Sequence, residues 1–361
     1  MINIIGAGPA GNYLAYLLTK TGKEVQVFEE HKEIGKPVQC TGIVTSEFED
    51  VLEPRKEFTV NKTNKVKIKS VSGKCIDLRL KRNNYILDRA KFDLYLAKQA
   101  EKEGADFFLG SQFINENHNS IFIKQNDKIK KINKGILIGA DGPLSSVARS
   151  HGIYIKRRMI VGFQYRVNMK NDNFIEFYPG IGIYAWIVPE GKGICRVGMC
   201  DYVGQNIRKT FDIFTKKIGI AKKSIIDCQA GLIPTYNPFI KIQKKDVFLI
   251  GDAAAQVKAT TGGGIVPGLI AAKGLAKSIL DGSSYKQNIW RLRKELFFHM
   301  IGREILDNLK KRDWDYLFKL FENKKNKEIL SSIERERISR LALPLFRNDP
   351  RFLFFVKKIF F

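Results

Sequence analysis

Residues 2–11, INIIGAGPAG, hold the pattern that decides the fold of this chain. The apolar run Ile2–Ile5 predicts a buried strand, and the G-x-G-x-x-G after it predicts a tight turn into a helix that extends to about Lys20. In such a turn the first glycine permits the bend, the second lets the backbone approach a pyrophosphate, and the third lets the helix pack on the strand. The positions concerned are Gly6, Gly8, Ala10 and Gly11.

A second strand is predicted at Glu24–Phe28, and an acidic residue, Glu29, follows it directly. A carboxylate at this position can accept hydrogen bonds from both ribose hydroxyls of an adenosine, while the helix start faces the anion. The order of strand, turn, helix, strand and acid therefore predicts a dinucleotide site in a Rossmann-like sheet. It does not separate NAD from FAD, and the alternative is a glycine-rich turn without a ligand.

Three later segments extend this frame. Residues 135–149, GILIGADGPLSSVAR, and residues 246–254, DVFLIGDAA, each read as a strand followed by a turn and a helix. The second turn contains Asp252 and leads to Gly262, Gly263, Gly264 and Ile265 at a helix start. A further helix is predicted to begin in the segment LDRAKFD, residues 87–93, which contains Arg89.

Together these segments resemble the FAD-dependent oxidoreductases of the para-hydroxybenzoate hydroxylase type, over about residues 1–285. The resemblance implies FAD as cofactor, with Asp252 on the ribityl and pyrophosphate region and the backbone of residues 262–265 on the pyrimidine edge of the flavin. It also implies that Arg89 reaches the FAD phosphates and that Phe113 contacts the adenine, mainly through its backbone. The alternative for Arg89 is an ion pair with Asp93, four residues further along the helix.

Two further motifs separate the chain from generic flavin hydroxylases. They are PVQCTG at residues 37–42 and YAWIVP at residues 184–189, the latter followed by Gly198. They resemble the geranylgeranyl reductase family, and archaeal reductases of digeranylgeranylglycerophospholipids within it. The chain departs from the Tyr-x-Trp-x-Phe-Pro and Gly-x-Gly pattern of that family at Val188 and Cys200.

The second resemblance implies an enzyme that saturates isoprenoid double bonds, with geranylgeranyl chains of archaeal ether-lipid precursors as substrates. It places Cys40, Thr41 and Gly42 near the flavin, where Cys40 is the catalytic candidate. Cys40 could be a proton source, a sensor of the flavin state or a packing residue. Tyr184 and Trp186 share one face of a strand and either line an isoprenoid slot or belong to the sheet core.

The expected fold class is mixed α/β, with a Rossmann-like FAD-binding domain, an inserted antiparallel sheet for the substrate and a C-terminal helical region. The FAD-binding domain comprises residues 1–60, 86–152 and 242–285, the sheet domain residues 61–85 and 153–241, and the C-terminal region residues 286–361. The five cysteines form no C-x-x-C pair, and the four histidines have no ligand spacing, so we expect a reducing compartment and no metal site.

The formal net charge of +25 implies an anionic partner. Residues 286–361 hold 19 Lys and Arg against 10 Asp and Glu, so we expect contact with an anionic membrane and a phosphorylated lipid, and no nucleic acid. For residues 289–309 packing is favoured, while residues 351–361 suit packing or a membrane equally. We expect a cytoplasmic protein at the inner face of the membrane.

Three questions stay open at this point. The electron donor could be NADPH, ferredoxin or a reduced deazaflavin, because the sequence contains no second dinucleotide fingerprint. An alternative enzyme is an FAD-dependent monooxygenase or halogenase of a small aromatic substrate. An alternative without catalysis is a flavin-binding or membrane-associated scaffold.

Overall fold

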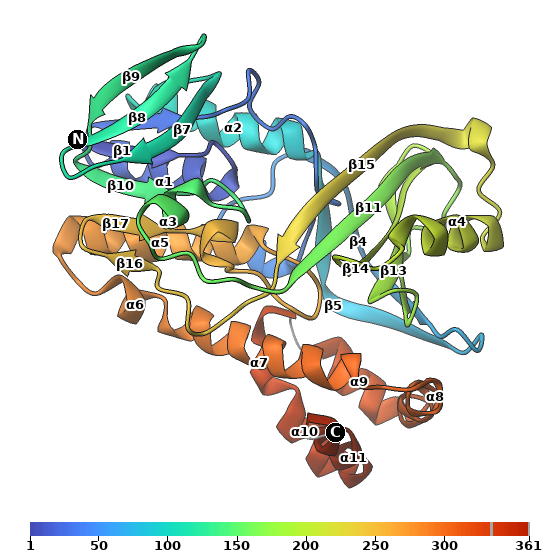
Figure 1. Cartoon of the computed structure of the whole chain (residues 1–361). Helices are drawn as coiled ribbons and strands as arrows, with labels where there is room; N and C mark the ends of the chain where they lie inside the picture. The colour runs from blue at the N-terminus through green and yellow to red at the C-terminus, as the bar shows by residue number, and fades with distance from the viewer. Residues whose placement is uncertain (333–334, 360–361) are drawn as a thin grey trace. The chain divides into compact units, whose positions relative to one another are not determined.

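The computed structural model describes residues 1–332 and 335–359 and divides the chain into two compact units (Figure 1). Unit 1 comprises residues 1–38, 88–157 and 234–297, and unit 2 comprises residues 39–87, 158–233 and 298–361. Residues 39–60, which the sequence analysis assigns to the FAD-binding domain, therefore group with unit 2. One reason is that residues 43–44 pair with a strand of the large sheet in that unit.

Unit 1 is built on a six-stranded sheet with the strand order β16-β17-β10-β1-β2-β6. Its strands are β1 (Ile2–Ile5), β2 (Val25–Phe28), β6 (Asp106–Phe108), β10 (Ile136–Gly139), β16 (Gln243–Lys244) and β17 (Val247–Leu249). Every pairing from β17 to β6 is parallel, whereas β16 is antiparallel at the edge. All four residues of β1 are buried, as expected for a central parallel strand.

Helices of unit 1 follow these strands. They are α1 (Pro9–Thr19), α2 (Arg89–Lys102), α3 (Ser146–Ser150), α5 (Ile265–Asp281), α6 (Tyr285–Asn288), the start of α7 (Trp290–Asp307) and the 3-10 turn η3 (Gly251–Ala254). Pro9 stands in the first turn of α1, where a missing N–H costs nothing, and α2 is capped by Asp88, whose side chain accepts from the N–H of Lys91. A separate antiparallel sheet contains β7 (Ser111–Glu116), β8 (Ser120–Gln125) and β9 (Lys128–Asn133).

Unit 2 contains an eight-stranded sheet with the order β15-β11-β14-β13-β12-β4-β5-β3. Its strands are β3 (Ile43–Val44), β4 (Thr59–Lys69), β5 (Cys75–Leu87), β11 (Met159–Asn168), β12 (Ile175–Pro179), β13 (Tyr184–Gly191), β14 (Ile194–Tyr202) and β15 (Ile225–Pro234). Among β3, β4, β5 and β11 to β14 the strand pairs are antiparallel except β12 with β4, which is parallel. With the Rossmann-like sheet and the C-terminal helices, this arrangement confirms the predicted fold class.

The large sheet carries an apolar cluster on each face, because side chains alternate along its strands. Ala185, Ile187 and Cys195 lie in one cluster, which Phe211 and Phe214 of α4 (Ile207–Lys217) cover. Trp186 and Cys200 lie in the other cluster. Cys195 and Cys200 thus face opposite sides of the sheet, as their spacing predicts. Short 3-10 turns, η1 (Ser46–Phe48) and η2 (Lys222–Ser224), lie in the connections of this unit.

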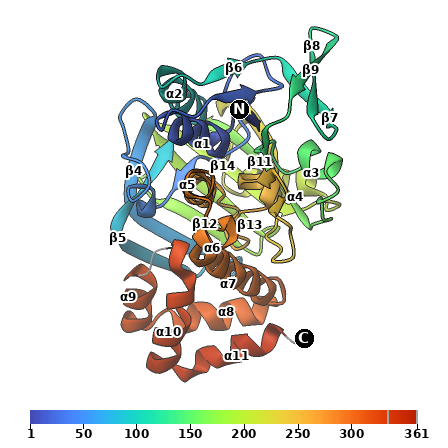
Figure 2. The ribbon, with the colours of Figure 1, turned by 90° about the vertical axis from the view of Figure 1, so that its left-hand side faces the viewer.

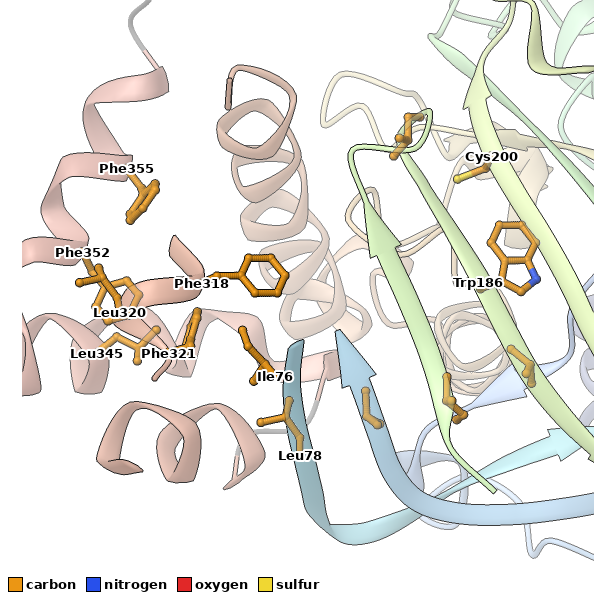
Figure 3. Close-up of a cluster of buried hydrophobic side chains, with 14 of the residues drawn as sticks. Ile76, Leu78, Trp186, Cys200, Phe318, Leu320, Phe321, Leu345, Phe352 and Phe355 are labelled. Carbon is orange, nitrogen blue, oxygen red and sulfur yellow. The ribbon is translucent and has the colours of Figure 1, made fainter. Parts of the chain in front are cut away.

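The C-terminal helices lie beside one another (Figure 2), and their buried side chains belong to the apolar cluster that contains Trp186 (Figure 3). They are α8 (Lys311–Leu320), α9 (Lys324–Ser332), α10 (Ala342–Asn348) and α11 (Leu353–Val356), with 3-10 turns η4 (Arg335–Arg340), η5 (Pro350–Phe352) and η6 (Lys357–Ile359). Phe318, Phe352 and Phe355 are buried in this cluster. The tail therefore packs through part of its aromatic side chains, while Leu353 and Phe354 are 50% and 40% exposed. Phe360 and Phe361 lie outside the described residues.

Candidate functional site

In the glycine-rich turn between β1 and α1, backbone atoms lie so close to Gly6 and Gly11 that neither position has room for a side chain. A Cβ on Gly6, at φ +104°, would lie 2.4 Å from the backbone oxygen of Ala140, and a Cβ on Gly11 would lie 2.2 Å from the oxygen of Gly6. A Cβ on Gly8, in contrast, would meet no atom within 4 Å. Gly8 therefore borders open space at the start of α1, and no side chain caps that helix end.

Glu29 lies against this turn at the end of β2. Its Oε2 accepts from the N–H of Ala7 at 2.7 Å, and its Oε1 accepts from the N–H of His31 at 3.0 Å and lies 2.5 Å from the Nδ1 of His31. The carbonyl of Glu29 accepts from the N–H of Ser111 at 2.8 Å, which brings the start of β7 to the same place. Phe113 lies further along β7 and is buried.

Arg89 forms the ion pair with Asp93 that the sequence offers as the alternative to phosphate contact. Its Nε and Nη2 donate to the two carboxylate oxygens at 3.1 and 2.9 Å. Burial raises the pKa of Asp93 although the charge and hydrogen bonds of Arg89 oppose the shift, and the charge of Glu29 adds to it. Arg89 and Glu29 thus lie in one electrostatic neighbourhood beside the glycine-rich turn.

Asp252 lies in η3, directly before the glycine-rich start of α5. Its Oδ1 is 2.9 Å from the place that a Cβ on Gly264 would occupy. Burial raises the pKa of Asp252 to about 6, against the opposing charges of Arg89 and Arg157. No side chain caps α5 at Gly264 and its first turn holds no acidic residue, so this helix start presents backbone N–H groups.

The glycines before α5 are held by the backbone of Lys258. Gly262, at φ +64°, donates its N–H to the carbonyl of Lys258 at 2.8 Å, and the carbonyl of Gly263 accepts from the N–H of Lys258 at 3.1 Å. Ala10 of α1 approaches the same region, since a Cβ on Gly251 would lie 3.2 Å from its Cβ. The structure therefore brings the two glycine-rich segments of unit 1 together.

Arg157 is a residue of this region that sequence reasoning missed. Its Nη1 donates to the carbonyls of Asp252 and Ala253 at 3.3 and 3.1 Å. The residue is 7% exposed with Nε and Nη2 buried, and its Cζ lies 4.8 Å from the centre of the Tyr154 ring. Burial lowers the pKa of Arg157. The sequence carries little signal for this role, because Arg157 stands in the basic run Lys156–Arg158.

These observations fit an anionic dinucleotide in unit 1. Two helix starts whose N-cap residues are glycines, the open space at Gly8 and the guanidinium of Arg157 can all serve pyrophosphate oxygens or other electron-rich groups. Glu29 supplies the acceptor that a ribose needs. Among residues 1–332 and 335–359, no group of three or more His, Cys, Asp or Glu residues could hold a metal ion.

Residues 39–42, here called the Cys40 segment, belong to unit 2 and form hydrogen bonds with side chains of the large sheet. The hydroxyl of Thr41 donates to Oε1 of Gln164 on β11 at 2.8 Å, and the N–H of Gly42 donates to Sγ of Cys40 at 3.3 Å. The carbonyl of Thr41 accepts from Nη1 of Arg196 on β14 at 2.5 Å. A segment outside regular structure thus acquires a defined position through polar side chains of two strands.

Tyr184 and Trp186 lie on β13, and the centroids of their rings are 5.7 Å apart. Trp186 belongs to the apolar cluster on one face of the sheet, and Tyr184 packs against that cluster. Nε1 of Trp186 donates to Oε1 of Gln164 at 3.3 Å. Gln164 therefore joins Trp186 to the Cys40 segment, and its own Nε2 donates to Oε1 of Gln229 at 2.6 Å. The two motifs that separate this chain from flavin hydroxylases meet on one side chain.

Strand register explains the glycine after the Tyr-x-Trp segment. Trp186 pairs with Gly198, and Tyr184 pairs with Cys200. Cys200 stands where the family pattern has a second glycine, and its Sγ donates to the carbonyl of Tyr184 at 3.7 Å. Burial raises the pKa of the Cys200 thiol to about 12.

The predicted site residues thus form two groups, each within one unit. Unit 1 holds Gly6, Gly8, Ala10, Gly11, Glu29, Arg89, Phe113, Asp252 and residues 262–265, and unit 2 holds Cys40, Thr41, Gly42, Tyr184 and Trp186. Sequence reasoning missed Gln164 and Arg196 in unit 2. Their signal was a polar residue between two apolar neighbours in a predicted strand.

Comparison with known proteins gives consistent results along the chain. A family model described as an NAD(P)-binding Rossmann-like domain matches residues 4–43. Digeranylgeranylglycerophospholipid reductase 2 of Methanothermobacter thermautotrophicus is 30% identical over 378 residues, which cover 94% of this chain and 94% of that protein.

Solved structures share the fold. A geranylgeranyl bacteriochlorophyll reductase-like protein from Thermoplasma acidophilum has a TM-score of 0.82 at 24% identity, covering 99% of this chain and 98% of the other. A myxobacterial FAD-dependent chondrochloren halogenase has a TM-score of 0.67 at 14% identity and 96% coverage of both chains. At these identities the two structures establish the fold alone.

Proposed function

Because this chain belongs to the digeranylgeranylglycerophospholipid reductase family, we propose that it saturates carbon–carbon double bonds of geranylgeranyl chains in archaeal ether-lipid precursors. The observation that carries this proposal is the similarity to a reductase of that name along almost the whole chain. The reaction makes the protein an oxidoreductase that acts on CH–CH groups. The substrate is an isoprenoid lipid.

We assign FAD as the cofactor, and the donor groups of unit 1 support that choice. The open space at Gly8 and the N–H groups at the starts of α1 and α5 suit a pyrophosphate and the electron-rich edge of a flavin. Glu29 would accept from a ribose hydroxyl, and Asp252 would face the ribityl chain. When bound and reduced, FAD supplies a hydride from its N5 atom.

An isolated alkene has no electron-withdrawing group to stabilise a carbanion, so hydride addition at one carbon must be coupled to protonation of the other. Cys40 is our candidate proton source: its thiol gives a proton to that carbon and takes one from solvent before the next cycle. The hydrogen bond from the N–H of Gly42 to Sγ supports this role, because it fixes the sulfur. Tyr184 and Trp186 supply apolar surface for the prenyl chain.

The test is an anaerobic turnover experiment with the FAD-loaded protein and a digeranylgeranylglycerol phospholipid. NADPH, reduced ferredoxin and a reduced deazaflavin are compared as electron donors. We expect the lipid to reoxidise the reduced flavin, and mass spectrometry to show two added hydrogen atoms for each saturated double bond. A reduced flavin that stays reduced in the presence of the lipid would contradict the proposal.

An FAD-dependent monooxygenase or halogenase is the second candidate, because a halogenase shares the fold. It requires oxygen, whereas alkene reduction does not. Turnover of a small aromatic compound only in air would favour this candidate. Purified protein that takes up no FAD would instead favour a scaffold.

We also propose that the tail contacts an anionic membrane surface. Leu343 of α10 is 55% exposed, and Leu353 and Phe354 of α11 are 50% and 40% exposed. Arg347 and Lys357, which follow Leu343 and Leu353 by four residues, are exposed as well. Apolar side chains among cations suit the headgroup region of anionic lipid. No helix among the described residues is both long and apolar enough to cross a bilayer.

Vesicle flotation tests this contact. We expect binding to vesicles of phosphatidylglycerol and weak binding to vesicles of phosphatidylcholine. Replacing Leu353 and Phe354 by serine should reduce binding, whereas Ile213→Ser on α4, at a position that is 61% exposed, should not. Equal binding of all three proteins would contradict the proposed surface.

A further inference from the structure

The buried guanidinium of Arg196 forms a hydrogen bond with the Cys40 segment. Nη1 of Arg196 donates to the carbonyl of Thr41 at 2.5 Å and to the carbonyl of Leu87, at the end of β5, at 2.9 Å. Arg196 is 5% exposed. A single nitrogen thus joins a loop to a strand end, and these are charge-assisted hydrogen bonds.

A second contact determines which way this guanidinium points. Nε of Arg196 donates to Oε2 of Glu190 at 2.9 Å. Glu190 also receives two hydrogen bonds from Arg166, from Nε at 2.9 Å and from Nη2 at 2.7 Å. Burial raises the pKa of Glu190, but the hydrogen bonds and charges of the two arginines outweigh it and hold the pKa below its usual value. Glu190 therefore stays ionised and accepts from Nε of Arg196. Nη1 of Arg196 is then directed toward the two carbonyl groups.

The turn at Gly42 is built around the same guanidinium. Gly42 has a φ of +73°, and a Cβ there would lie 2.5 Å from the carbonyl oxygen of Leu87 and 2.9 Å from Nη1 of Arg196. The carbonyl of Gly42 accepts from the N–H of Leu87 at 2.8 Å, and its N–H donates to Sγ of Cys40. Consecutive contacts therefore connect Arg196 through Thr41 and Gly42 to the thiol of Cys40.

We propose that Arg196, oriented by Glu190, is the positioning residue that holds the Cys40 thiol in place for alkene reduction. The role of Arg196 in turnover rests on the proposed function, whereas its effect on the position of the Cys40 thiol does not. A lysine at position 196 has a single nitrogen, so it lacks the separate Nε that donates to Glu190 while Nη1 donates to the two carbonyls. A misplacement of about 1 Å can reduce a rate by ~100-fold.

The first readout is the rate at which Cys40 is alkylated by iodoacetamide, measured without substrate. Cys75 and Cys228 are exposed and are replaced by serine in every variant, while Cys195 and Cys200 are buried. We expect Arg196→Lys to change the alkylation rate of Cys40 by about 3-fold or more, because the loop is released. The matched control is Arg82→Lys. Arg82 also joins a carbonyl, that of Ser46, and a carboxylate, that of Glu49, in the same unit.

The second readout is turnover of the digeranylgeranyl lipid. We expect Arg196→Lys to lower kcat by about 10-fold or more and to leave KM within about 2-fold, because Arg196 is 5% exposed and its guanidinium donates to groups of the protein itself. Glu190→Gln keeps Arg196 but removes the negative charge that orients it. It should therefore change the alkylation rate and kcat in the same directions as Arg196→Lys does. It carries the test if Arg196→Lys does not fold. Thermal unfolding monitors the fold of each variant.

An unchanged alkylation rate and kcat in folded Arg196→Lys or Glu190→Gln protein would overturn the proposal, as would an equal change in Arg82→Lys. A wild-type protein that reduces no lipid would refute the proposed function instead. In that case the alkylation rates alone still decide whether Arg196 controls the thiol.

Discussion

Trp186 on β13 lies directly across from Gly198 on β14, and the indole occupies the space that a side chain at position 198 would need. A Cβ on Gly198 would lie 2.5 Å from indole carbon atoms. The Trp and the later Gly of this sequence are therefore a single packing arrangement between neighbouring strands.

Gly198→Ala should destabilise the protein for this reason. The added methyl would also lie 2.6 Å from Cβ of Gln164, so neither neighbour can move away freely. Overpacking of this kind costs about 1–3 kcal/mol, which urea unfolding would measure. Gly162→Ala on β11 is the control, since the nearest atom to its Cβ would be 3.7 Å away, an ordinary contact. Equal stability of Gly198→Ala and Gly162→Ala would refute this explanation.

Cys40→Ala should retain FAD and lose most alkene reduction. The substitution removes the thiol proton while it leaves the hydrogen bonds of Thr41 to Gln164 and Arg196 in place. Loss of a proton donor reduces turnover by about 100-fold or more. Cys75→Ala, at an exposed position, is the control. Unchanged single-turnover reoxidation of the flavin would return Cys40 to a packing role.

Glu29→Ala should weaken FAD binding without unfolding the protein. Hydrogen bonds to a charged group contribute about 1.5–3 kcal/mol, so we expect the dissociation constant to rise by about 10-fold or more. Titration with FAD, followed by quenching of flavin fluorescence, would measure it. Glu30→Ala changes the exposed neighbour and should bind FAD normally. Equal affinity of the two variants would reject the ribose contact.

Asp252 should make the protein without FAD less stable as the pH rises. Burial raises its pKa to about 6 from 3.8 against the charges of Arg89 and Arg157, so the folded state binds this proton more tightly than the unfolded chain. The contribution to the free energy of unfolding is fully present below about pH 4 and is lost as the pH rises through about 6, by up to ~3 kcal/mol.

Urea unfolding between pH 4 and 7 checks this contribution through the difference between wild type and Asp252→Asn. That difference should change with pH, because the asparagine cannot titrate. Asp106→Asn, at an exposed position of β6, is the matched control for the substitution. A constant offset between Asp252→Asn and wild type would show that Asp252 does not titrate in this window.

The dinucleotide frame could be predicted because its parts are close in sequence. Gly6, Gly11 and Glu29 lie within one strand-turn-helix-strand segment, and their backbone requirements are local. The shared face of Tyr184 and Trp186 followed from the two-residue period of a strand. In contrast, the four-residue spacing of Arg89 and Asp93 was compatible both with an ion pair between them and with contact of Arg89 with the FAD phosphates. The structure contains the ion pair, and phosphate contact stays a prediction.

The C-terminal tail shows the limit of composition as evidence. The aromatic and basic residues of segment 351–361 suited a membrane surface and a packed subdomain equally well, whereas packing was favoured for residues 289–309. The large sheet offers an apolar face that Phe352 and Phe355 help to cover, whereas Phe354 is left 40% exposed. Which side chains are buried depends on the sheet they meet, and that sheet is distant in sequence.

The sequence by itself determined the Rossmann-like frame, the family resemblance and the two motifs around Cys40 and Trp186. Only the tertiary structure decided that Gln164 joins those motifs and that Arg196 fastens the Cys40 segment. The physical reason is that a strand's alternation predicts which way its side chains point but not which strand will lie beside it. Strand order is set by burial of the whole sheet, and it brings polar groups from distant positions to one loop.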